Sequence, residues 1–419
     1  MKTRNFTSII ILFVLLSSCS SRTYVSYLED QTEVVKMSDS LQFNSLDAAF
    51  YENDLFLLGE VHEIETSPRV DFALFTQLHE EMGIDTYLAE MDLAQGYYLE
   101  QYIKGSNAVP LDEILKEWVV YIGSISTQFR HRWEKLRAYY ATLPEGKKFN
   151  LVGIDRTRDL TLSRKLLLEK LPAEYHSEIP EELEALIAWA DSDLSEILSS
   201  TTFNETDRTL LENMYFNLSE YHQVRYRNAF MYENFKRYHA QNNWSGKKLY
   251  GGFGFAHTLQ AYSQMFAGKI KKDTTLGYSD KMVSLNTMYV DSKLTVQSKA
   301  LPKFMQDKGQ AFTKFNYSQD NRIFLYVKGI ADYKKVTTPN SISLIKLDAE
   351  NSPYKTSTRG TKVKQLISIW EGFDIIDGTA TTDYAQYIIF VRNADWIEPD
   401  VISNDQDSVP ASKGNATTK

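Results

Sequence analysis

The sequence has little cysteine, no excess of basic residues and no apolar run long enough to span a membrane. Cys19 is the only cysteine among 419 residues, which excludes an intrachain disulfide. The net charge of −9 argues against nucleic acid as a partner, because phosphate binding needs a basic surface. The serine-hydrolase elbow Gly-x-Ser-x-Gly, a Walker loop and the zinc motif His-Glu-x-x-His are also absent. Hydrolysis by an activated water remains open.

The start of the chain predicts a targeting segment. Two basic residues precede a short apolar stretch from Ile9 to Leu16, and the stretch ends in Leu-Ser-Ser-Cys19. This ending resembles a bacterial lipobox, in which cleavage precedes the cysteine and the cysteine carries lipid. We therefore expect residues 1–18 to be a lipoprotein signal peptide and residues 19–40 to be a polar tether. The acyl chains would anchor the protein to a membrane of the bacterial cell envelope, on the periplasmic side or at the outer membrane.

Two short apolar runs end in ionisable residues. The first extends from Leu55 to His62 and the second from Tyr87 to Met91, and each reads as a buried parallel strand. Between them, apolar residues recur at helical spacing from Val70 to Met82. In open α/β sheets the ligand site lies outside the carboxyl ends of the strands. The pattern therefore predicts that Glu60, His62 and Glu90 lie together.

The same pattern recurs twice further along the chain. The run from Phe149 to Asp155 is followed by Arg156, and the run from Lys248 to Phe253 leads into His257 and a helix expected to end at about Phe266. We predict an α/β fold with a mainly parallel sheet flanked by helices, a helical insertion and a β-rich C-terminal part. The expected later strands cover residues 282–289, 322–327, 342–347 and 387–391. One domain is expected over about residues 41–400, with the insertion at about 93–245 and a disordered tail at 401–419.

These residue types support two kinds of chemistry. A histidine can act as a general base on water while a carboxylate orients it, and an arginine can stabilise an oxyanion. Two histidines with carboxylates could equally hold a divalent metal, with Glu60, His62, Glu90 and His257 as ligands. The spacing does not choose between them. The candidate catalytic residues are His62, Glu60, Glu90, His257, Asp155, Arg156 and Arg69.

Other polar residues have weaker support. Arg69 begins the first predicted helix shortly after His62 and could face the site. Arg132 enters a later helix beside two other basic residues. It could reach the site, and a solvated basic helix start explains its position equally well. Arg227 and Asn228 fall in a long helix predicted at about residues 221–240, where surface or packing roles are favoured.

Several short motifs together resemble one superfamily. They resemble the erythromycin esterase-like, ChaN-like and Tiki group over about residues 50–395, and the resemblance implies an α/β core with its site at the strand ends. In erythromycin esterases, which open a macrolide lactone, a histidine in the first motif is the proposed general base, and His62 matches it. Glu60, Glu90 and His257 match other site positions, and Arg69 matches a family arginine. The motifs are Leu58-Gly-Glu-Val-His62, Tyr87-Leu-Ala-Glu90, Val152-Gly-Ile-Asp155, Gly251-Gly-Phe-Gly-Phe-Ala-His257 and Tyr387-Ile-Ile-Phe-Val-Arg-Asn393.

The first motif departs from the esterase pattern. Only Val61 separates Glu60 from His62, where the esterases usually have two residues, and Glu63 replaces a glycine. This spacing is closer to the ChaN-like branch, whose members bind haem, and Tiki members are metal-dependent proteases. The chain is nevertheless longer than a typical ChaN protein, and its helical insertion resembles that of the esterases. Together with the lipobox, the resemblance therefore implies a lipid-anchored hydrolase that cleaves an ester or amide of a small-molecule or peptide substrate. The alternatives are a haem- or iron-binding lipoprotein and a metal-dependent peptidase.

Overall fold

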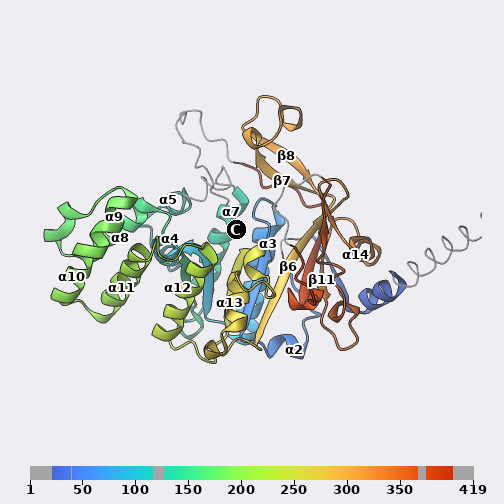
Figure 1. Cartoon of the computed structure of the whole chain (residues 1–419), viewed down its shortest axis with the longest axis horizontal. Coiled ribbons are helices and arrows are strands. Elements are labelled where there is room, and N and C mark those ends of the chain that lie inside the picture. The colour runs from blue at the N-terminus through green and yellow to red at the C-terminus, as the bar shows by residue number, and fades with distance from the viewer. Residues whose placement is uncertain (1–20, 39, 117–126, 367–373, 400–419) are drawn as a thin grey trace, which may run out of the picture.

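The computed structural model describes residues 21–38, 40–116, 127–366 and 374–399. The described strands form a central eight-stranded sheet with helices on both faces and a smaller β-rich part at one end (Figure 1). The predicted α/β class, with a mainly parallel sheet and a β-rich C-terminal part, is confirmed. The predicted signal peptide, the predicted lipid attachment at Cys19 and the predicted tail at 401–419 lie outside the described residues.

The sheet is parallel except at one edge. In chain order its strands are β1 (Thr32–Lys36), β2 (Leu55–Glu60), β3 (Thr86–Asp92), β4 (Asn150–Asp155), β5 (Leu249–Gly254), β6 (Met282–Val290), β11 (Ser341–Lys346) and β13 (Tyr387–Arg392). Their spatial order is β1-β11-β13-β6-β2-β5-β3-β4. All neighbours from β13 to β4 pair in parallel, and β11 and β1 continue the sheet antiparallel. The carboxyl ends of β2, β5, β3 and β4 therefore meet at one edge of the sheet.

The centre of the sheet is buried on both faces. Leu55 to Leu58 of β2 have no exposed surface, and the strand pairs with β5 on one side and β6 on the other. A continuous apolar run is typical of a parallel strand covered on both sides by helices. Burial on both faces also explains why the strongest strand signals in the sequence belong to the strands that carry the candidate site.

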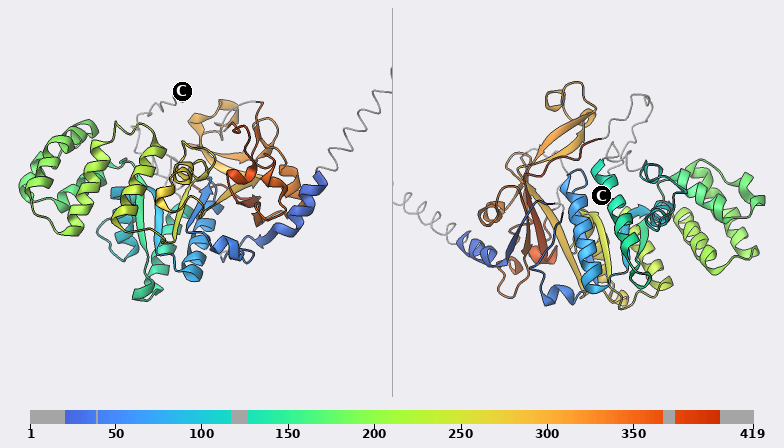
Figure 2. Two further views of the ribbon diagram at one scale, coloured as in Figure 1. Left: turned by 60° about the horizontal axis from the view of Figure 1, so that its bottom comes forward. Right: turned by 180° about the vertical axis from the view of Figure 1, so that it is seen from behind.

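Helices cover both faces of the sheet. The described α-helices are residues 21–31, α2 (Ala48–Tyr51), α3 (Thr66–Met82), α4 (Leu93–Ile103), α5 (Leu111–Ile114), α7 (Thr127–Thr142), α8 (Leu160–Lys170), α9 (Leu183–Trp189), α10 (Ser195–Ser200), α11 (Glu205–Ser219), α12 (Arg227–Gln241), α13 (Phe266–Lys272) and α14 (Ile330–Val336). The views from the front and from behind show α3 and α7 on one face and α12 and α13 on the other (Figures 1 and 2).

The helices expected as an insertion form two groups, separated by β4. The first group, α4 to α7, connects β3 to β4, and the second, α8 to α12, connects β4 to β5. In Figure 1, α8 to α11 project beyond the β4 edge of the sheet. The last helix of the second group, α12, returns to pack on β4 and so reaches the edge where the strands end.

The β-rich part contains strands that the sequence pattern did not predict. A hairpin of β7 (Ser292–Gln297) and β8 (Phe312–Tyr317) follows β6. β9 (Asp320–Asn321), β10 (Leu325–Val327) and β12 (Val363–Lys364) form a small antiparallel sheet. Of the strand predicted at 322–327, only the last three residues are in β10.

The prediction of a polar tether at 19–40 is wrong for its described residues. Residues 21–31 form a helix and Thr32–Lys36 pair with β11 as an edge strand. The helix docks because Tyr24, Tyr27 and Leu28 share one face, as the spacing i, i+3, i+4 requires. Leu28 has no exposed surface, and the Tyr24 hydroxyl donates a hydrogen bond of 2.6 Å to the Ser357 hydroxyl. The polar residues of this segment lie on its other face.

Two predicted helices begin later than expected. The helix expected from about residue 221 starts at Arg227, because the preceding Tyr226 has an extended backbone. The helix expected directly after His257 is instead the short 3-10 helix η4 (Phe255–Thr258), and α13 begins at Phe266. Among the described residues, no helix is long and apolar enough to cross a membrane.

Candidate functional site

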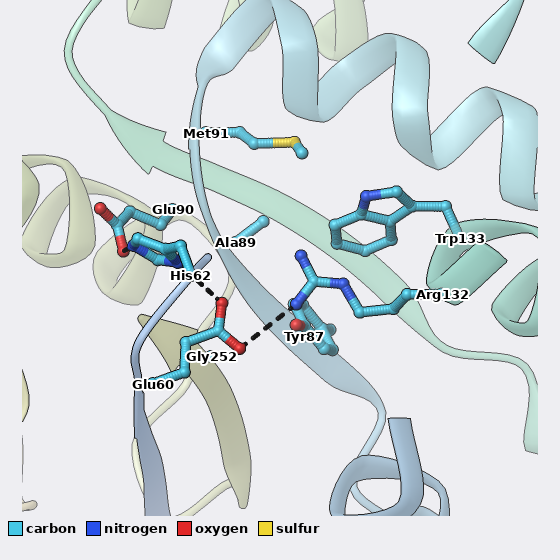
Figure 3. Close-up of a pocket in the computed structure, with 9 residues that line it drawn as sticks. All are labelled: Glu60, His62, Tyr87, Ala89, Glu90, Met91, Arg132, Trp133 and Gly252. Carbon is cyan, nitrogen blue, oxygen red and sulfur yellow. Dashed lines mark hydrogen bonds and ion pairs between the residues drawn. The ribbon is translucent and has the colours of Figure 1, made fainter. Parts of the chain in front are cut away.

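Four neighbouring strands bring the expected polar side chains together. Glu60 ends β2, Glu90 lies near the end of β3, Asp155 ends β4, and His257 lies in η4 directly after β5. All four side chains are buried. His62 follows Glu60 after one residue and lies between the two glutamates (Figure 3).

His62 is held by carboxylates on both ring nitrogens. Its Nδ1 lies 2.9 Å from Glu60 Oε1 and its Nε2 lies 3.6 Å from Glu90 Oε2. Burial alone would lower the pKa of His62, but the Glu90 carboxylate and the hydrogen bond to Glu60 raise that pKa to about 9. The imidazole of the resting protein is therefore protonated at neutral pH. When the imidazole is neutral, its proton remains on Nδ1, which faces Glu60, and the lone pair is on Nε2.

Glycine is required beside His62. The Gly254 backbone N–H donates a 2.5 Å hydrogen bond to Glu90 Oε2. A Cβ atom on Gly254 would lie 2.9 Å from His62 Nε2, closer than non-bonded atoms normally approach. The second half of the Gly-rich motif thus lets the backbone of β5 reach Glu90 while the imidazole keeps its place.

Arg227, at the start of α12, joins three of the predicted residues. Its Nη2 donates 2.5 Å hydrogen bonds to Glu90 Oε1 and to Asp155 Oδ2, and its Nη1 donates to His257 Nε2 at 3.1 Å. Burial would raise the pKa of Glu90, but the Arg227 guanidinium holds it well below its usual value. Burial opposes ionisation of Asp155 too, and Arg227 and Arg158 lower its pKa. The sequence interpretation favoured a surface or packing role for Arg227, and that interpretation is wrong.

His257 orients this arginine. Asn228 Oδ1 accepts a hydrogen bond from the backbone N–H of Phe266 at 3.0 Å, which fixes that atom as an acceptor. His257 Nδ1 lies 2.7 Å from the same oxygen and must donate to it. Its Nε2 therefore accepts from Arg227. Its Nε2 also lies 3.4 Å from Glu90 Oε1.

A second arginine holds Glu60 from the opposite side. Arg132 of α7 lies 3.6 Å from Glu60 Oε2 and 3.1 Å from the fully buried Asp71 of α3. Tyr87 and Tyr250 both donate hydrogen bonds to Asp71. Burial raises the pKa of Asp71, whereas Arg132 and His62 outweigh burial at Glu60 and lower its pKa. For Arg132, the sequence supported a role in the site and a solvated helix start equally. Nothing in the sequence indicated a role for Asp71, because it looks like an ordinary polar residue of a helix.

These contacts form one alternating series of charges across the strand ends. Each neighbour in the series lies within 3.6 Å of the next. In spatial order its members are Asp71, Arg132, Glu60, His62, Glu90, Arg227, Asp155 and Arg158. We call this series the charge row. His62 is at its centre, and its proton completes the alternation.

A large cleft opens along the charge row. Its volume is about 1120 Å³, and its lining includes Glu60, His62, Glu90, Arg227 and His257. The opposite wall consists mainly of apolar side chains from the hairpin β7–β8, from β10 and from β13. A small hollow of about 10 Å³ lies behind, between Glu60, His62, Glu90, Arg132 and Trp133 (Figure 3). That volume is about what one water needs, and Glu60 Oε2, which has no hydrogen-bond partner among the described residues, is the kind of group that binds it.

Two predicted arginines differ in their outcome. Arg69 donates to the Ser38 carbonyl at 2.8 Å and pairs with Glu65 at 3.7 Å, and it does not line the cleft. Its expected place near the reacting atoms is therefore wrong, because the first turn of α3 turns it toward the N-terminal segment. Arg156 does line the cleft, with its guanidinium 4.9 Å from the centre of the Tyr221 ring.

The donor atoms do not suit a divalent metal. Both oxygens of Glu90 accept from the protein, and both ring nitrogens of His257 are engaged by Asn228 and Arg227. The Arg227 guanidinium lies among the proposed ligands and would repel a second cation. Within the described residues, no three histidine, cysteine or acidic side chains are grouped to hold a metal.

Comparison with known proteins places this architecture. No protein-family model and no curated protein matches the chain. A protein from Bacillus cereus aligns with a TM-score of 0.64 at 12% identity, over 91% of this chain and 99% of its own. A succinoglycan biosynthesis protein gives 0.62 at 17%, over 90% and 99%. A mutant of the erythromycin esterase EreC in its open conformation gives 0.57 at 12%, over 87% and 98%. The chain has the fold of erythromycin esterase.

The shared fold spans nearly the whole of each matched structure, so it includes the helical region and the β-rich part as well as the sheet. It confirms the resemblance drawn from the sequence motifs at the level of fold. At identities between 12% and 17%, the likeness shows the fold and not the chemistry of the site.

Proposed function

We propose that the protein is a lipid-anchored hydrolase that cleaves an ester or amide by attack of water, with His62 as the general base. One observation carries the proposal: His62 is held between two buried carboxylates at the lining of a large cleft. A histidine in a cleft with a strongly raised pKa and a carboxylate on Nδ1 is a recognised arrangement for moving protons.

The first step transfers a proton from water to His62. In its neutral form the imidazole keeps its own proton on Nδ1 and donates it in a hydrogen bond to Glu60. Nε2 then accepts a proton from the water as the water oxygen attacks the carbonyl carbon. The resulting imidazolium lies between Glu60 and Glu90, so the two carboxylates stabilise the charge that forms. In the second step the bond to the leaving oxygen or nitrogen breaks, and His62 returns the proton to it.

Arg227 is the best placed group to stabilise the oxyanion. It lines the cleft, and its guanidinium is fixed by Asp155, Glu90 and His257. A guanidinium that is held in place before the reaction stabilises developing negative charge without reorganising. Arg69 and Arg156 were the arginines that the sequence suggested as catalytic residues, and of these two only Arg156 lines the cleft. His257 then acts as a positioning residue for Arg227 and not as a second acid or base.

The two alternative functions make demands that the described side chains do not favour. A metal-dependent peptidase needs metal ligands that are not already paired with arginine, whereas Glu90 and His257 both contact Arg227. A haem protein needs an axial ligand with an accessible lone pair. The nitrogens of His257 are engaged by Asn228 and Arg227, and the ring of His62 is held between two carboxylates that raise its pKa to about 9. We expect no Soret band of a ligated haem on titration with haemin.

Anchoring through Cys19 remains part of the proposal. Because Ser21 already begins a helix that packs on the domain, the folded part starts almost directly after the lipidated residue. The domain would therefore be held close to the membrane, in the bacterial cell envelope.

The test compares two histidine substitutions in assays with p-nitrophenyl esters and p-nitroanilides, with and without a chelator. We expect His62→Ala to lower kcat by about 10²–10⁴-fold, the range for loss of a general base. His222→Ala is the matched control, because this exposed histidine pairs with Glu184 away from the cleft. Full activity in His62→Ala, loss of activity with chelator, or no turnover of any ester or amide by the parent would each contradict the proposal.

A further inference from the structure

The arginine without a counterion in the cleft is Arg156. Among the described residues its guanidinium has no carboxylate partner; its side chain lies over the Tyr221 ring, and both residues line the cleft. The carboxylate of the preceding residue, Asp155, is already paired with two other arginines. It accepts two hydrogen bonds from Arg227 Nε, another from Arg227 Nη2 and an ion pair of 3.2 Å from Arg158.

An unpaired guanidinium in such a place binds anions. Arginine presents a planar fork of donors that matches a carboxylate or a phosphate, and stacking on an aromatic ring holds the fork in one orientation. An arginine on an outer surface would simply be solvated. Arg156 instead lines a cleft whose opposite wall is mainly apolar. In such a cleft water competes less with the guanidinium for a bound anion than it does on an outer surface.

The apolar wall is far from Arg156. In the order of the sheet, β4 and β6 are separated by β3, β5 and β2, so the two ends are about 20 Å apart at about 4.8 Å per strand. Arg156 follows β4, and the hairpin that supplies Leu294 and Val296 to the cleft follows β6. Leu325, Val327 and Ile388 continue this apolar wall.

His62 lies between these two ends. It follows β2, which neighbours β6 and is separated from β4 by β5 and β3. A ligand that contacts both Arg156 and the apolar wall must therefore pass the imidazole. From this placement we infer that the substrate is a long amphipathic anion in which the cleaved ester or amide joins an apolar acyl chain to a head group that ends in a carboxylate or a phosphate. This inference rests on the proposed function for the bond that is cleaved, but the binding of such an anion does not.

The experiment measures binding of amphiphiles that contain no cleavable carboxylic ester or amide bond, so that it is independent of hydrolysis. Isothermal titration calorimetry would compare tetradecanoate, tetradecyl phosphate and the uncharged tetradecanol. The protein would lack residues 1–19, since every element of the described fold lies after them. We expect at least one of the two anions to bind about tenfold more tightly than the alcohol, as one charge-assisted contact provides.

Arg156→Gln should remove this preference and leave the affinity for tetradecanol unchanged, and Arg156→Lys should keep part of it. Arg225→Gln is the matched control, because Arg225 is also stacked on a tyrosine, Tyr226, but does not line the cleft. A preference for tetradecanoate alone assigns a carboxylate head group, and a preference for the phosphate alone assigns a phosphate. Equal binding of all three, no binding of any, or equal losses in Arg156→Gln and Arg225→Gln would overturn the inference, whereas loss of hydrolysis alone would not.

Discussion

Removing Arg227 should destabilise the protein strongly, and the effect should depend on pH. In Arg227→Gln the carboxylates of Glu90 and Asp155 lose the guanidinium that contacts both of them at 2.5 Å. Glu90 keeps the Gly254 N–H and Asp155 keeps Arg158 at 3.2 Å. Breaking a buried ion pair from one side typically costs about 3–5 kcal/mol. Because these remaining partners compensate in part and the Arg227 side chain is 27% exposed, we expect about 3 kcal/mol.

The pH dependence follows from the direction of the pKa shifts. In the parent, Arg227 lowers the pKa of Glu90 and of Asp155. Each lowered pKa contributes stability at a pH above the unfolded value, and this contribution is lost as the pH falls through the folded pKa. Without Arg227, both folded pKa values rise, so the variant regains stability relative to the parent as the carboxylates become protonated. The difference in unfolding free energy should shrink steadily from pH 7.5 to pH 4.5.

Urea unfolding followed by tryptophan fluorescence would measure this difference. Arg164→Gln is the control, since its 3.8 Å pair with the largely exposed Glu181 should contribute less than about 1 kcal/mol. Adding Asp155→Asn to Arg227→Gln should restore part of the stability, because one unpaired charge is then removed. A loss below about 1 kcal/mol for Arg227→Gln at pH 7.5, or a loss that does not change with pH, would refute the reasoning.

Three further predictions concern activity and location. The pKa of about 9 for His62 means that kcat/KM should rise about tenfold per pH unit between pH 7 and 8 and level off near pH 9, and a flat profile would exclude His62 as the base. Gly254→Ala places a Cβ 2.9 Å from His62 Nε2 and should lower kcat about 100-fold, whereas Gly146→Ala, with open space around its Cβ, should leave kcat unchanged. Cys19→Ser should move the protein from the membrane pellet to the soluble fraction after expression in bacteria, and unchanged pelleting would contradict lipid anchoring.

The central sheet could be predicted from the sequence because its strands are buried on both faces. The apolar side chains from Leu55 to Leu58 are shielded from water on both faces only in the interior. Parallel neighbours then place the carboxyl ends of such strands side by side. Glu60, Glu90 and Asp155 were identified in this way, without knowledge of the connecting helices. The segment at 21–36 could not be, because its apolar contacts are formed with Tyr354 and other residues more than 300 positions away.

The cations of the site could not be predicted for a related reason. Arg132 and Arg227 come from helices of the two connecting groups, and their sequence neighbours are ordinary helical residues. Only the packing of α7 and α12 against opposite faces of the sheet brings them to the strand ends. A signal was nevertheless present: three acids at the ends of buried strands need counterions, which cationic residues of nearby helices can supply.

The alternation of the charge row links the fold to the proposed reaction. Arg132 and Arg227 each neutralise the carboxylate that is next to His62, and they keep Glu60 and Glu90 ionised in spite of burial. The ionised glutamates in turn raise the pKa of His62, which makes the neutral imidazole scarce at pH 7 but a strong base. If Arg132 were replaced by a neutral residue, Glu60 would lose its counterion and the imidazolium of His62 would lose a nearby cation, so the pKa of both groups would rise. Arg132→Gln should therefore shift the rise of the kcat/KM profile to higher pH, an outcome that a purely structural role for Arg132 does not predict.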